Sequence, residues 1–269
     1  MEVKYLIALF LLTSTLESNA QKRESTLILV HGAGHGSWSW SKVIPLLANK
    51  NISTTAVDLP GQSNDTLKLF NHTLADDVDC IRNATDSVQG KVILAGHSSG
   101  GVAIAQAAEL LGIAKVEKLI FLDAFMPKDG ESVGSIAAKV ASDIKNKKEA
   151  GAPPEMLFTA NHKVFKWNPE IVENHFYHDC SKADIANAKA NLKWQSVASI
   201  STQVKLSDDI YGGIPKYYIL CTEAKDLDKS SIATNVPVKK IFKISSSHSP
   251  FLSKPNELAR ILLEICSDK

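Results

Sequence analysis

The stretch of this sequence with the clearest chemical potential is Gly96-His97-Ser98-Ser99-Gly100, which has the spacing Gly-x-Ser-x-Gly. An apolar run suited to a buried strand precedes it at residues 91–95, and an Ala- and Leu-rich run suited to a helix follows at residues 102–111. Glycines on both sides of the serine allow the sharp strand-to-helix turn that lifts its hydroxyl clear of a sheet. The pattern predicts Ser98 as a nucleophile for acyl transfer.

A serine hydroxyl is a weak nucleophile at neutral pH and needs a base within hydrogen-bond reach. His248 is the predicted base, because it follows the last predicted strand and loops at the carboxyl ends of parallel strands meet at one edge of the sheet. The alternative is a surface histidine in a serine-rich loop. His31, His35 and His97 are expected at the same edge and are assigned to loop packing, since pairing either of the first two with the serine would break the order serine, acid, histidine.

The acid that would orient the base has several candidates. Asp226 follows the penultimate predicted strand, where chain order and direction are right, and is the first choice. Asp228 or Glu223 could reach the base by a different loop path. Asp123 lies at the end of the strand that follows the helix expected at residues 102–111. Each could instead be an ordinary solvated loop carboxylate.

Two backbone amides are expected to form an oxyanion hole. One belongs to Ser99 at the start of the elbow helix, and the other to the glycine-rich loop at residues 31–36, most plausibly to Ala33. A phosphate-binding role for that loop fails on spacing, because neither Gly-x-Gly-x-x-Gly nor Gly-x-x-x-x-Gly-Lys is present.

The elements that must position these groups alternate along the chain as strand, loop and helix, which predicts an α/β fold with a parallel sheet. Residues 128–203 break the alternation: they contain helix-like segments and no clear buried strand, and predict a helical cap over the strand ends. The expected strands are residues 26–30, 53–57, 91–95, 116–122, 216–221 and 239–244, and the expected helices are residues 40–49, 74–88, 102–111, 132–150, 169–177, 181–191 and 256–266.

The 269 residues carry a formal net charge of +1, with charges mixed rather than blocked. No basic stripe with interleaved aromatics is present, which argues against nucleic acid and favours a small-molecule partner. The four cysteines lack metal-ligand spacing, so no metal is expected, and no organic cofactor is implied. An oxidising compartment would permit a disulfide, for example between Cys180 and Cys221.

Residues 1–20 have the pattern of a signal peptide: an apolar run at residues 5–12 follows Lys4, and small Ser18 and Ala20 fit cleavage after Ala20. The alternative is an uncleaved anchor or a disordered tail. The prediction is an exported chain, periplasmic or secreted, with one domain at residues 21–269, no membrane contact after cleavage, and a monomeric or homodimeric state.

The set of motifs resembles the α/β-hydrolase superfamily, and looks closest to its branch of plant methyl esterases, hydroxynitrile lyases and related bacterial esterases. The resemblance implies a six-stranded parallel core under a helical cap, Ser98 as nucleophile, His248 as base, and the amides of Ala33 and Ser99 as oxyanion donors. It is carried by the loop at residues 31–38, Asp58-Leu-Pro-Gly61, the elbow at residues 96–101, residues 122–127 and His248.

Two positions depart from the family pattern. Many members have a sequence similar to Cys-Thr-Glu-Asp after the penultimate strand, with that Asp as the acid; here alanine, Ala224, stands there, so Asp226 must substitute or Asp123 must serve. The similar lyases use a lysine directly after the catalytic histidine and a threonine in the first loop, where this chain has Ser249 and Gly32. We therefore expect a serine carboxylesterase for small apolar esters, with a hydroxynitrile lyase-like enzyme or a non-catalytic ligand-binding member as the alternatives.

Overall fold

The computed structural model describes residues 25–145 and 155–268. The predicted signal peptide, residues 1–20, lies outside the described residues, as does the end of the helix expected up to residue 150. Export and the monomeric or homodimeric state therefore stay predictions. Within the described ranges, no helix is both long enough and apolar enough to cross a bilayer.

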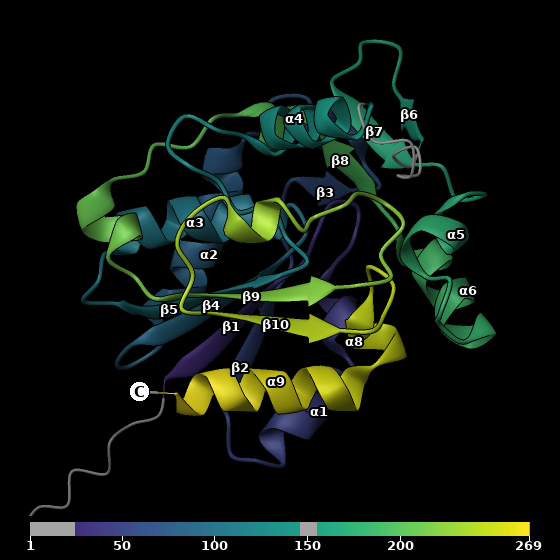
Figure 1. Cartoon of the computed structure of the whole chain (residues 1–269). Helices are drawn as coiled ribbons and strands as arrows, with labels where there is room; N and C mark the ends of the chain where they lie inside the picture. Colours follow the sequence, from purple (N-terminus) through teal and green to yellow (C-terminus); the bar gives the residue numbers. More distant parts are fainter. Residues whose placement is uncertain (1–24, 146–154, 269) are drawn as a thin grey trace, which may run out of the picture.

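Six parallel strands of the described chain form the central sheet, in the order β10-β9-β5-β4-β1-β2. The chain runs from β1 outward to β2, returns to β4 on the other side of β1, and then continues to the opposite edge (Figure 1). The loops after β1 and β4 therefore leave the sheet in different directions. Open α/β sheets bind ligands at such a point, where the order of the strands changes direction. The strands are β1 (Thr26–Val30), β2 (Thr54–Val57), β4 (Val92–His97), β5 (Val116–Leu122), β9 (Lys216–Cys221) and β10 (Lys240–Ile244).

Helices cover both faces of this sheet (Figure 1). In β1, Leu27 and Leu29 pack on one side with α1 and α9, while Ile28 and Val30 pack on the other side with α2 and α3. The inner strands β1, β4, β5 and β9 are buried along most of their length and read as nearly continuous apolar runs, which is why the sequence revealed them. The covering helices are α1 (Val43–Ala48), α2 (Leu74–Asp86), α3 (Gly100–Leu111) and α9 (Pro255–Ser267).

The predicted cap is helical only in part. Three short strands of the cap, β6, β7 and β8, form a small antiparallel sheet of order β3-β8-β7-β6 with β3, which comes from outside the cap, and α4 lies beside that sheet at the top of Figure 1. Strands of two to four residues are too short to show an alternating pattern, so the sequence did not reveal them. The elements are β3 (Gln62–Ser63), β6 (Met156–Phe158), β7 (Val164–Trp167), β8 (Trp194–Ser196), α4 (Val133–Lys145), α5 (Val172–Phe176), α6 (Lys182–Asn191) and α7 (Val197–Ser201).

Short helical turns complete the described chain. The helix expected at residues 40–49 is split, because a separate turn precedes α1. Cys180 and Cys221, which the sequence left open for a disulfide, are both free thiols, and Cys221 is buried at the end of β9. The remaining elements are α8 (Pro250–Ser253), η1 (Ser37–Trp40), η2 (Thr66–Leu69), η3 (Asp208–Gly212) and η4 (Ile232–Thr234).

Candidate active site

Ser98 lies on the sharp turn between β4 and α3. Its φ of 53° is in the left-handed region, which residues with a side chain rarely adopt. A Cβ at Gly96 would come within 2.6 Å of the Gly100 carbonyl oxygen, and a Cβ at Gly100 within 2.6 Å of the His31 carbonyl oxygen. Both contacts are with backbone, so only glycine fits at either position. Strained turns of this kind cluster at functional sites.

His248 lies in the loop between β10 and α8 and is 2% exposed. Its Nδ1 lies 2.6 Å from Oδ2 of Asp123, the residue that follows β5. The other oxygen of that carboxylate, Oδ1, accepts a hydrogen bond of 3.2 Å from the Cys221 amide. A neutral imidazole that donates from Nδ1 leaves Nε2 free to take a proton, which is the arrangement that a general base requires.

The backbone of Asp123 is also strained, with a φ of 43°. Its amide donates to the Ile219 carbonyl oxygen of β9 at 2.7 Å, which fixes the residue at the strand end. Burial alone would raise the pKa of the Asp123 carboxyl, but the Lys229 ammonium and the hydrogen bond from His248 hold that pKa below its ordinary value. The carboxylate is therefore ionised and able to stabilise an imidazolium.

Asp226, the first choice of acid from the sequence, is buried at the same site but is not on Nδ1. Its Oδ2 lies 3.7 Å from Nε2 of His248. Asp228 and Glu223 are exposed, and Oδ1 of Asp228 accepts a hydrogen bond from the backbone amide two residues further on. The orienting contact to Nδ1 is made by Asp123, which the sequence analysis kept only as an alternative, because the end of β5 lies beside the loop that carries His248.

Lys229 is the residue at this site that the sequence analysis missed. Its side chain is fully buried, with Nζ 3.0 Å from Oδ2 of Asp123, 2.6 Å from Oδ2 of Asp226 and 3.4 Å from Nδ1 of His248. Burial would lower the pKa of this lysine, but the two carboxylates raise it above its ordinary value, so the ammonium is charged. Its only signal in the sequence is a spacing of three residues from Asp226.

The group formed by Asp123, Asp226 and His248 is compact, with ligand-type atoms within 4.8 Å of one another. Two carboxylates and an imidazole at this spacing attract a cation. In this chain the Lys229 ammonium lies between the carboxylates, so the charge that a metal ion would supply is already provided by a side chain.

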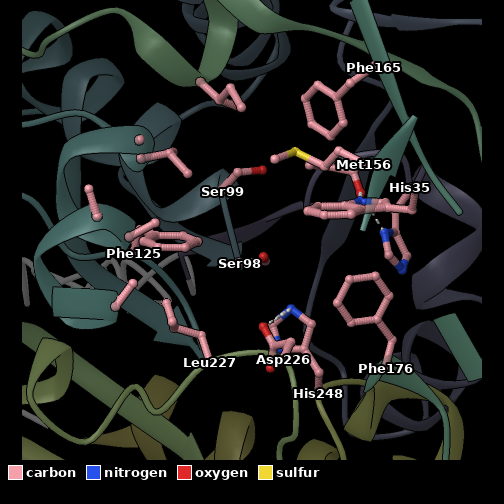
Figure 2. Close-up of a pocket in the computed structure, with 18 residues that line it drawn as sticks. His35, Ser98, Ser99, Phe125, Met156, Phe165, Phe176, Asp226, Leu227 and His248 are labelled. Atoms are coloured by element: carbon pink, nitrogen blue, oxygen red, sulfur yellow. Dashed lines mark hydrogen bonds and ion pairs between the residues drawn. The ribbon is translucent and has the colours of Figure 1, made fainter. Parts of the chain in front are cut away.

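Ser98 and His248 line the same cavity, and Figure 2 shows the Ser98 oxygen beside the His248 ring with Asp226 next to it. Among the described residues, no hydrogen bond joins the Ser98 hydroxyl to that ring. Catalytic hydrogen bonds are often long in the absence of substrate and shorten when it binds.

The amides of Ala33 and Ser99 both belong to residues that line this cavity. Within the described ranges, neither amide donates a hydrogen bond to another backbone group. The Ala33 carbonyl oxygen, in contrast, accepts hydrogen bonds of 2.9 Å from Nε1 of Trp167 in β7 and of 2.9 Å from Nδ1 of His35. The cap therefore helps to fix the loop that presents the first amide.

The other histidines at this edge are buried and neutral. Burial lowers the pKa of His31 and His97, and it lowers that of His35 to about 3. Each makes structural hydrogen bonds: His31 Nε2 accepts from the Leu59 amide, His35 Nε2 accepts from the Tyr177 hydroxyl, and His97 Nε2 donates to the carbonyl oxygen of residue 248. These contacts hold loops in place, which is the role that the sequence assigned to these residues.

The cavity has a volume of about 340 Å³ and is largely apolar. Figure 2 shows aromatic and aliphatic side chains around its upper part and the His248 and Asp226 group at its floor. A cavity of this size and character suits a small apolar ligand with one polar reacting group. Its apolar wall consists of Phe125, Val133, Ala137, Ala138, Ala141, Met156, Phe165, Trp167, Phe176, Ile200 and Leu227.

Comparison with known proteins gives matches over nearly the whole chain. The sequence profile of the "Alpha/beta hydrolase family" matches residues 27–261. Methylesterase 7 of Arabidopsis thaliana is 29% identical, with 93% of this chain and 98% of that protein aligned.

Two solved structures are also similar. Polyneuridine aldehyde esterase is 26% identical with a TM-score of 0.78, covering 91% of this chain and 100% of that one. Tomato Methylketone Synthase I complexed with 2-tridecanone is 26% identical with a TM-score of 0.76, covering 90% of this chain and 97% of that one.

Proposed function

Because the chain belongs to the alpha/beta hydrolase family, which its match over residues 27–261 shows, we propose that it is a serine carboxylesterase acting through an acyl-enzyme on Ser98. One observation carries this proposal: a buried imidazole, held by a carboxylate on Nδ1, lines the same apolar cavity as the strained serine. The names of its relatives, which include methylesterases and an esterase, support the same class of reaction.

Acylation begins when Nε2 of His248 takes the proton of the Ser98 hydroxyl as Oγ attacks the carbonyl carbon of the ester. The electron pair of the C=O bond moves to oxygen, and the resulting oxyanion accepts hydrogen bonds from the amides of Ala33 and Ser99. Asp123 stabilises the imidazolium. When the tetrahedral intermediate collapses, the C–O bond to the alcohol breaks and Nε2 returns its proton to the alcohol oxygen.

Deacylation repeats these steps with water in place of the serine. Nε2 of His248 takes a proton from water, the hydroxide oxygen attacks the acyl carbon, and the same two amides stabilise the second oxyanion. Collapse breaks the bond to Ser98 Oγ, which recovers its proton from the imidazolium. The carboxylic acid leaves and the site is restored.

The substrate we propose is a small, largely apolar ester. The cavity wall offers aliphatic and aromatic side chains to the acyl group, and its volume of about 340 Å³ lies at the lower end of small-molecule sites. Methyl esters are favoured, since several relatives are named methylesterases.

Ester hydrolysis is favoured over the lyase chemistry because of Gly32. A Cβ at this position would lie 2.7 Å from Cβ of Ser98 and 2.9 Å from Nδ1 of His97. The threonine that similar lyases use there would therefore require these neighbours to move. The residue after His248 is Ser249, not lysine.

Hydrolysis of p-nitrophenyl acetate and butyrate by the purified protein tests the proposal. Wild type should release p-nitrophenol, while Ser98→Ala should lose at least about 10⁴ in kcat/KM. Ser99→Ala is the matched control: it removes a neighbouring hydroxyl but keeps the amide, and should stay within about tenfold of wild type.

Equal rates from wild type and Ser98→Ala would overturn the esterase mechanism. Cyanide release from mandelonitrile with poor ester turnover would instead assign the chain to the lyases. Thermal stabilisation by an ester without any product would indicate a binding protein.

A further inference from the structure

The buried ion cluster around His248 contains two charged groups that a catalytic triad does not need, the Asp226 carboxylate and the Lys229 ammonium. Oδ2 of Asp123 touches both Nδ1 of His248 and Nζ of Lys229, and Lys229 also binds Asp226 at 2.6 Å. Asp226 in turn lies 3.7 Å from Nε2 of the same ring. Two carboxylates therefore lie close to the imidazole, and one ammonium contacts both of them.

Four other titratable groups near the ring are neutral. His35 and His97 are buried with lowered pKa values, and burial raises the pKa values of Tyr218 and Cys221 well above their ordinary range. Asp179 carries a further charge beside the loop of His248: its carboxylate accepts a hydrogen bond from the Ser247 amide, and its hydrogen bonds lower its pKa although burial would raise it.

The formal charges of the cluster sum to zero when His248 carries the proton of the serine. Two carboxylates and one ammonium leave one net negative charge while His248 is neutral. When the imidazole takes the serine proton, the cluster becomes neutral as a whole. Without the lysine, two uncompensated carboxylates would hold a proton on the ring, because nearby negative charges favour the charged imidazolium.

We propose that Lys229 is a positioning residue that offsets the charge of Asp226 beside His248, so that Asp123 can orient the ring as a base. Asp226 in this arrangement is the partner of the lysine rather than the acid of the triad. A catalytic role for Lys229 rests on the proposed function. Its electrostatic effect on the His248 ring does not.

The opposite charges of Lys229 and Asp226 give the proposal a directional test. Lys229→Met leaves two carboxylates on the ring and should raise the pKa of His248 by about one unit or more. Asp226→Asn leaves one carboxylate and the ammonium, and should lower the pKa of His248. The double variant restores one net negative charge and should bring that pKa back close to the wild-type value.

Two measurements report these shifts. The first is NMR titration of the histidine ring signals, with the His248 signal identified among eight histidines by its loss in His248→Gln. The second is the acid limb of the kcat/KM profile with p-nitrophenyl butyrate, which reports the essential base of the free enzyme. The NMR titration needs no turnover, so it tests the lysine even if the protein proves not to be an esterase.

Shifts of opposite sign in the two single variants, cancelled in the double variant, would support the proposal. A residue that serves only to hold the fold would change thermal stability without this pattern. If His248 titrates in Lys229→Met where it does in wild type, or if both single variants shift it in the same direction, the proposal is wrong. Should Lys229→Met fail to fold, Asp226→Asn and the double variant still decide the sign.

Discussion

The elbow after β4 and the loop after β9 deliver groups to one cavity, but different forces hold them. At the elbow, the Ser98 amide donates to the Leu122 carbonyl oxygen at 3.3 Å, and the Ser98 carbonyl oxygen accepts from the Phe125 amide at 3.0 Å. The glycines on both sides pack backbone against backbone. In the loop after β9, Asp226 and Lys229 are held by a buried ion pair of 2.6 Å and by contacts to the His248 group.

This difference determines what each region responds to. Backbone contacts leave no room for a methyl group and do not depend on protonation, so the elbow is sensitive to shape. The loop depends on compensated charges in a low-dielectric interior, where removing one partner leaves the other uncompensated. It is therefore sensitive to charge and pH.

The largest expected effect is a difference in kcat between variants of the two carboxylates in the ion cluster. Asp123→Asn removes the acceptor on Nδ1 and should lower kcat by about 10⁴, since the imidazole loses both its orientation and its counter-charge. Asp226→Asn is the matched control and should retain kcat within about tenfold at its own pH optimum. Steady-state kinetics on p-nitrophenyl butyrate measures both. A greater loss in Asp226→Asn than in Asp123→Asn would identify Asp226 as the acid.

A single methyl group at the elbow is the next test. Gly100→Ala would place a Cβ 2.6 Å from the His31 carbonyl oxygen and should reduce the free energy of unfolding by about 1–3 kcal/mol. Gly134→Ala in α4 is the control, because its Cβ would meet nothing closer than 3.7 Å, and alanine favours a helix by about 1 kcal/mol. Urea unfolding compares them. Equal stabilities would show that the elbow backbone yields more easily than its contacts indicate.

Protonation of a buried histidine should affect stability on the acid side. Burial lowers the pKa of His35 from 6.5 to about 3, so between these values the unfolded chain binds a proton that the folded chain does not. Stability should therefore decrease as pH falls from 6.5 to 3, by up to about 1.4 kcal/mol per pH unit for this group. In urea titrations at pH 4–6, His35→Gln should show a shallower slope than wild type. An unchanged slope would mean that His35 does not contribute.

The smallest effect concerns the hydrogen bond from the cap to the loop that carries Ala33. Trp167→Phe removes the hydrogen bond from Nε1 to the Ala33 carbonyl oxygen but keeps an aromatic ring, and His35 still donates to that oxygen. A loss of about 1 kcal/mol in transition-state stabilisation, roughly fivefold in kcat, is expected. Trp194→Phe in β8 makes the same chemical change in the same small sheet and should leave kcat unchanged. Equal effects in both variants would exclude a specific role for Trp167.

Much of the fold could be predicted from the sequence. The predicted bounds of β1, β5 and β9 agree with the structure, and those of α2, α3 and α9 differ by two residues or fewer. These elements have long apolar runs or a helical period, which are local signals. The cap sheet could not be predicted, because its short strands pair with residues far away, as Gln62 of β3 does with Gln195 of β8.

The candidate site divides in the same way. Ser98 and its two glycines are recognisable because the turn is a local feature, in which the backbone at Gly96 lies against that at Gly100 and leaves no room for a side chain. Chain order could not decide which carboxylate contacts Nδ1 of His248. That contact depends on which of several loop carboxylates lies beside the ring in the folded chain, and it is made by Asp123.

The sequence by itself determined the order of the strands and helices of the main sheet, the position of the elbow and most of the groups at one edge of that sheet, because each follows from spacing along the chain. Only the tertiary structure decided that Asp123 rather than Asp226 contacts Nδ1 of His248, and that Lys229 lies between the two carboxylates. The reason is physical. Asp123 is separated along the chain by 125 positions from His248 and by 106 positions from Lys229. Coulomb forces depend on distance in space rather than along the chain.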